Sequence, residues 1–103
     1  MIPGIEIALG GQTFTVAPMN MKTLQIVTPL LGSLRGIEGG GLTQENIQNI
    51  VTIIQLAINR NHPDVTFDFV NENMDLVNMG GLLEAAMKVS GLQKTGEAPA
   101  ASA

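Results

Sequence analysis

Four carboxylates in the second half of the chain have a spacing that could support chemistry. Asp64, Asp68, Glu72 and Asp75 follow one another at intervals of 4, 4 and 3 residues, so on a continuous helix they would line one face. Such a face could hold a metal ion, dock a basic partner or be solvated. The run lacks the glycine and final glutamate of a calcium loop. A solvated face is therefore the simplest interpretation, and a docking face for a basic partner is the next.

The chain contains one histidine, His62, and no cysteine. A nucleophilic mechanism would need a serine or threonine held beside His62, and no motif in the sequence places one there. A histidine followed by Pro63 at the end of a helix is typical of a turn. We therefore predict that the protein is not an enzyme and that it binds no metal and no cofactor.

Residues 36–41, GIEGGG, form the third candidate site. Successive backbone N–H groups in a glycine-rich loop can bind an anion. A phosphate-binding loop continues with lysine and then serine or threonine, whereas here Leu42 and Thr43 follow. We therefore expect a flexible connector.

The composition is apolar for a chain of 103 residues, with 45% hydrophobic and 14% charged residues. Excess apolar surface predicts either self-association or a long helical partner, and the alternative is a well-buried small core. The net charge is −4, with only 5 basic residues, so we expect no binding to nucleic acid. No apolar run approaches the roughly 18 residues that a membrane span needs. The start of the chain lacks the basic region of a signal peptide, and its apolar run is too short for one.

Alternating apolar residues around Gly10 and Gly11 predict a β-hairpin over residues 4–17. Its core-facing residues would be Ile5, Ile7, Leu9, Phe14 and Val16.

Asn20 is a candidate N-cap for a helix over 20–34, in which Pro29 predicts a kink or a break. The buried stripe of this helix would contain Leu24, Val27, Leu31 and Leu34, flanked by Ile26 and Leu30.

The central element is a predicted helix over 43–61, capped by Thr43, with Asn49 on its outer face. Its apolar residues recur at the spacing of one helical face. They are Ile47, Ile50, Val51, Ile54, Ala57 and Ile58, widened by Ile53 and Leu56.

Two further helices complete the prediction. A short one spans about 67–74 and is capped by Asp64 or Thr66, and the last spans 79–90 after a possible cap at Asn78. In the last helix, Gly80 and Gly81 are expected to permit a close helix approach. The expected fold is α+β, an N-terminal hairpin packed on three to four helices, with one domain over 1–92 and a disordered tail over 93–103.

Two surfaces are candidates for binding a partner. The first is an apolar face of the last helix, because a terminal helix can keep one face free, and methionine adapts to different surfaces. It consists of Met79, Leu82, Leu83 and Met87. The second is the acidic run, Asp64, Asp68, Glu72 and Asp75, facing a basic partner. The methionines could equally be core filling.

Three stretches of the chain resemble the tail assembly chaperones of long-tailed bacteriophages. They are IEIALGGQTFTVAPMNMKTL near the start, AINRNHPDVT after the central helix, and NMGGLLEAAMKVSGL in the last helix. The family's turn R-N-H/Y-P-D-v-T is matched by residues 60–66, and its v-x-G by 89–91. The resemblance covers residues 4–92, and its motifs are structural rather than catalytic.

The resemblance implies a non-enzymatic role in the cytoplasm of the infected host. Proteins of that family bind the long helical tape measure protein, help to recruit tail tube protein around it, and are absent from the finished virion. The alternative is a structural tail or connector subunit, which would be retained in the virion. Either protein could also form a homo-oligomer.

Overall fold

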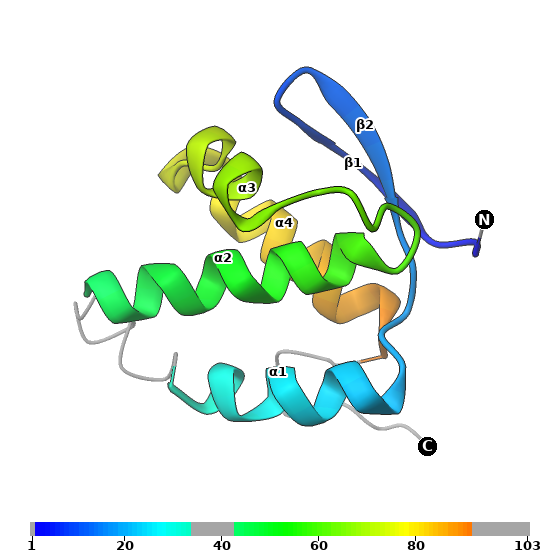
Figure 1. The fold of residues 1–103 in the computed structure, drawn as a ribbon, viewed down its shortest axis with the longest axis horizontal. Helices are drawn as coiled ribbons and strands as arrows, with labels where there is room; N and C mark the ends of the chain where they lie inside the picture. Colours follow the sequence, from blue (N-terminus) through cyan, green and yellow to red (C-terminus); the bar gives the residue numbers. More distant parts are fainter. Residues whose placement is uncertain (1, 34–42, 92–103) are drawn as a thin grey trace.

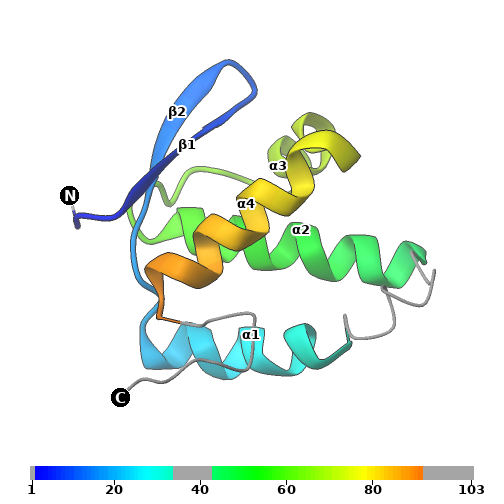
Figure 2. The ribbon, with the colours of Figure 1, turned by 180° about the vertical axis from the view of Figure 1, so that it is seen from behind.

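A hairpin of two strands followed by four helices makes up the computed structural model, which describes residues 2–33 and 43–91. The elements are β1 (Ile5–Leu9), β2 (Gln12–Val16), α1 (Met21–Ser33), α2 (Gln44–Asn59), α3 (Phe67–Asn73) and α4 (Leu76–Val89). In Figure 1, α2 runs through the middle of the molecule between α1 and the hairpin. Figure 2, which shows the molecule from behind, has α4 crossing in front of α2. The predicted α+β fold, a hairpin on a small group of helices, is confirmed.

Two glycines close the hairpin. Gly10 and Gly11 have positive φ angles of 61° and 76°, which a two-residue turn of this hand requires and which glycine adopts without steric cost. The strands pair antiparallel, with Ile7 opposite Phe14. The predicted core-facing residues share one face of the hairpin, but their burial differs between the strands. Those of β2 are buried, whereas Ile5 and Ile7 of β1 are half-buried.

Helix α1 begins after Asn20, whose Oδ1 accepts the N–H of Thr23 at 2.9 Å, as predicted. Pro29 lies inside α1 and does not break it, since one helix continues to Ser33. Val27 is fully buried against α2, whereas Ile26, predicted to flank the buried stripe, is 49% exposed. Leu34 of that stripe lies outside the described residues.

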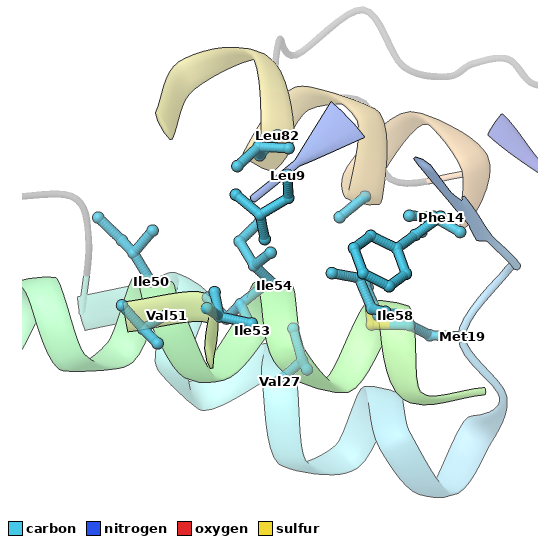
Figure 3. Packing of buried hydrophobic residues seen from close by; sticks show 14 residues of the cluster. Leu9, Phe14, Met19, Val27, Ile50, Val51, Ile53, Ile54, Ile58 and Leu82 are labelled. Atoms are coloured by element: carbon cyan, nitrogen blue, oxygen red, sulfur yellow. The ribbon is translucent and has the colours of Figure 1, made fainter. Parts of the chain in front are cut away.

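Helix α2 forms the centre of the core, as its apolar period predicts. The Thr43 hydroxyl accepts the N–H of Asn46 at 3.1 Å and caps the helix. Figure 3 shows its isoleucines between Val27 of α1 and Leu82 of α4. The buried residues of α2 are Ile50, Val51, Ile53, Ile54, Ala57 and Ile58. Each fully buried isoleucine contributes about 1.5–3 kcal/mol relative to an exposed one.

Two positions of α2 differ from the prediction. Ile47, expected in the buried stripe, is 39% exposed, because the first turn of α2 extends beyond the core. Asn49, expected on the outer face, is half-buried.

The turn after α2 is held by side chains that bind distant backbone groups. Asn61 bonds both backbone groups of Ile2, at 2.8 and 2.7 Å, and donates to the Thr15 carbonyl at 3.0 Å. His62 accepts the N–H of Thr15 through Nε2 at 3.1 Å, and its ring packs edge-on against Phe14. These bonds join the turn to the hairpin.

Two more residues at the end of α2 have similar roles. Arg60 donates to the carbonyl of Pro18 at 2.6 Å. Asn59 donates to the carbonyls of His62 and Val65, at 3.1 and 2.9 Å. The polar sequence around Pro63 is therefore a structural joint between α2, α3 and the hairpin.

Thr66 rather than Asp64 caps α3, since its hydroxyl accepts the N–H of Phe69 at 3.1 Å. Helix α4 begins at Leu76, three residues before the predicted start at Met79. Asp75 is the N-cap. Its Oδ1 accepts two N–H groups, and Asn78 returns a bond to the Asp75 N–H at 2.8 Å. Asn78, the predicted cap, is instead the other half of this capping box.

In the described part of the chain, no other helix approaches the glycines of α4 closely. A Cβ added at Gly80 or Gly81 would meet none of the described atoms within 4 Å, so the prediction that they serve a close helix contact is wrong. Gly91 ends α4 with a φ of 81°, a positive value that glycine adopts readily. The loop over 36–41, Leu92 at the predicted domain boundary and the tail over 93–103 lie outside the described residues.

Candidate partner-binding surface

The acidic run does not form one helical face. Only Asp68 and Glu72 share α3, because that helix is seven residues long. Asp64 lies in the preceding turn, and Asp75 caps α4. The four carboxylates therefore do not share one helix, and their role as a docking face for a basic partner stays a prediction. Among the residues that the structure describes, no group of three or more His, Asp or Glu side chains could hold a metal ion.

The four apolar candidate residues of α4 do not form one exposed face either. Leu82 is 6% exposed and belongs to the core, so it is not available to a partner. Met79 and Leu83 are half-buried and pack against the core. Leu83 and Met87 line one side of a hollow of about 320 Å³ on the outer face of α4, together with Gly80 and Glu84. The expected single apolar face is thus divided between the core and the surface.

A different apolar site forms where the start of α2 meets the corner between α3 and α4. We call it the corner hollow. It has a volume of about 170 Å³ and is lined by Ile47, Val51, Asn71, Met74, Asp75, Leu76 and Met79. It brings together Met79 of the predicted apolar surface and Asp75 of the predicted acidic surface.

One residue of the corner hollow is an unusually exposed apolar side chain. Leu76 is 69% exposed, and Val77, which follows it in the sequence but does not line the hollow, is 94% exposed. Both occupy the first turn of α4, where the capping box fixes the backbone. Large aliphatic residues held in water on a rigid turn are typical of binding surfaces.

Charge is distributed unevenly around the corner hollow. Asp75 is the only charged residue among those that line it in the described part of the chain. The basic residues of the described ranges lie elsewhere. Lys22 is at the start of α1, Arg60 at the end of α2 and Lys88 at the end of α4. Figure 1 shows these three ends together, at the opposite end of the molecule from the start of α2. The described lining of the corner hollow therefore carries one negative charge and no positive charge.

Another hollow, of about 480 Å³, lies between β2, the turn after α2 and α3. Its lining includes Phe14, Asn61, His62, Asp64 and Phe69. The polar side chains of Asn61 and His62 are already bonded to backbone groups. Their geometry explains how the hairpin is attached, and it assembles no nucleophile–base pair.

We found no protein family, curated protein or solved structure that matches this chain. In the described ranges, no helix is both long enough and apolar enough to cross a membrane.

Sequence reasoning missed the exposed apolar residues at the start of α2 and of α4. Ile47 falls in the apolar period of α2 and so looks buried, and Leu76 and Val77 precede the predicted start of α4. The signal that could have found them is Asp75 followed three residues later by Asn78. This is a capping pair, which places Leu76 and Val77 inside the first helical turn.

Proposed function

We propose that this protein is a non-enzymatic assembly chaperone of the kind found in long-tailed bacteriophages. It would bind the tape measure protein in the host cytoplasm and help to recruit tail tube protein during tail assembly. The observation that carries this proposal is the corner hollow, with Leu76 exposed in its lining and Val77 exposed in the same first turn of α4.

The chemistry of the corner hollow fits one class of occupant. An amphipathic helix binds by inserting apolar side chains of one face into such a groove. Asp75 in the lining favours a helix that carries lysine or arginine beside its apolar ridge. A tape measure protein, being long and helical, could offer many such segments along its length.

The motif shared with the chaperone family supports a binding role and gives no support to catalysis. Arg60, Asn61, His62 and Thr66 each bond a backbone group that fixes the fold. This structural role accounts for the motif without requiring any catalytic function.

Co-expression with any long helical protein found to be encoded next to this chain tests the proposal. We expect such a helical protein to become soluble and to co-purify with the chaperone. Mass spectrometry of mature particles should find no copy of this chain. Stoichiometric recovery from purified particles would instead identify a structural tail or connector subunit, and no complex with any co-encoded helical protein would refute the chaperone.

A further inference from the structure

The two outer edges of the hairpin differ in their hydrogen bonding. The outer edge of β2 is occupied at Thr15, whose N–H is donated to His62 Nε2 and whose carbonyl accepts from Asn61 Nδ2. The turn after α2 therefore takes the place of a third strand beside β2. No further strand can pair with β2 at this position.

The register then fixes what β1 presents on its own outer edge. Thr15 directs its backbone groups away from β1, so Thr15 and its partner Glu6 form a pair without mutual hydrogen bonds. Such pairs alternate along an antiparallel ladder, and Ala8 with Thr13 is the next. The N–H and C=O groups of Glu6 and Ala8 consequently point outward. Within the described residues, β1 pairs with β2 alone, and no hydrogen bond reaches these outward groups.

We propose that the outer edge of β1 binds the same edge of a second copy of this chain. The two β1 strands would run antiparallel about a two-fold axis at Ile7, and each Glu6 would bond the backbone of Ala8 in the other copy. The two hairpins would join into one sheet of four strands. This inference is independent of the proposed function.

Three observations favour a second copy as the occupant. Because the β2 edge is blocked, the only hairpin edge that a copy can offer is that of β1, so the assembly closes as a dimer and does not grow into a filament. The register places each Glu6 opposite an alanine rather than another glutamate, which avoids like-charge repulsion. It also sets Ile7, which is now only half-buried, opposite Ile7 of the other copy.

The edge of β1 also lacks the devices that natural proteins use to prevent pairing. Residues 5–9 contain no lysine, proline or bulge. Glu6 is their single charge, and its side chain projects from the face of the strand rather than along the edge.

Disulfide trapping tests both the partner and the register, because the chain has no cysteine of its own. The variants Glu6→Cys and Ala8→Cys are purified separately, mixed and oxidised. In the proposed register the unlike thiols belong to a bonded pair with Cα atoms about 5.5 Å apart, which a disulfide can span. Like thiols would be separated by about 8 Å and could not be bridged. We expect the cross-linked dimer mainly in the mixture, whereas equal yields from each variant alone would overturn the register.

A second experiment measures the dimer by sedimentation equilibrium of the full chain. Ala8→Pro removes an outward N–H that the isolated protomer does not use, so it should weaken the dimer at least about tenfold while the fold is retained. Thr13→Pro is the matched control, because it removes the corresponding N–H on the β2 edge, and it should leave the dimer unchanged.

Charge provides a variant that does not depend on tolerance of proline. Ala8 is exposed and would face Glu6 of the other copy, so Ala8→Lys should tighten the dimer and Ala8→Glu should weaken it. A wild-type chain that remains monomeric at every concentration would refute the proposal. So would a dimer that ignores Ala8 substitutions, or one that is disrupted equally by Thr13→Pro.

Discussion

Asn61 links two segments that are distant from it in the sequence. Its side chain bonds Ile2 on both backbone groups and also bonds the carbonyl of Thr15. The sequence could place Asn61 in a turn, because Pro63 follows, but it could not show these partners. Long-range polar bonds have no period along the chain, and this is why the joint escaped prediction.

Replacing Asn61 should therefore destabilise the protein. Asn61→Ala leaves three backbone groups without their partners and should lower the free energy of unfolding by about 1–3 kcal/mol. Urea unfolding followed by circular dichroism measures this value. Asn71→Ala, at an exposed asparagine of α3, is the control and should be nearly neutral. Equal stability of the two variants would show that the joint does not matter.

Asp75 combines two roles, and they can be separated. Asp75→Ala removes the cap of α4 and should cost about 0.5–2 kcal/mol of stability. Asp75→Asn keeps a capping side chain, so stability should be retained, but the negative charge in the lining of the corner hollow is lost. We expect Asp75→Asn to reduce the salt dependence of partner binding while the melting temperature stays the same. A large loss of stability in Asp75→Asn would contradict this separation.

Helices α2 and α4 were predicted with different accuracy, and the reasons lie in the residues at their ends. Helix α2 was predicted closely, because its apolar period, its Thr43 cap and Pro63 all agree. Helix α4 was predicted to start too late, because Asn78 resembles a cap as much as Asp75 does. The structure selects Asp75 because its carboxylate reaches two N–H groups while Asn78 bonds back.

Substitutions on the two sides of α2 test which of its faces is buried. Ile54 is 1% exposed in the core, so Ile54→Asp buries an unpaired carboxylate and should cost several kcal/mol, about enough to unfold a small domain. Gln48→Glu, on an exposed position of the same helix, should leave the fold intact. Far-ultraviolet circular dichroism distinguishes the outcomes, and two equally folded variants would mean that the buried face of α2 is wrongly assigned.

Over the whole molecule, the described residues form three regions. These are the turn after α2 with its bonds to the hairpin, the hydrophobic core and the corner hollow. The core and the hairpin could be predicted, because apolar periodicity reports burial directly. The corner hollow could not, because it forms only when α2, α3 and α4 come together in space. The predicted apolar and acidic surfaces each contributed one residue to it, Met79 and Asp75.

The affinity for an amphipathic helix of the tape measure type tests the central claim most directly. Isothermal titration calorimetry should compare the double variant Leu76→Gln/Val77→Gln with Met21→Gln/Ile26→Gln. Each variant exchanges two exposed apolar side chains for uncharged polar ones, the first pair in the first turn of α4, where Leu76 lines the corner hollow, and the second on α1. The account predicts that the first variant binds at least about tenfold more weakly, whereas the second binds like the wild type. Equal affinities for all three proteins, or a loss confined to the α1 variant, would contradict it.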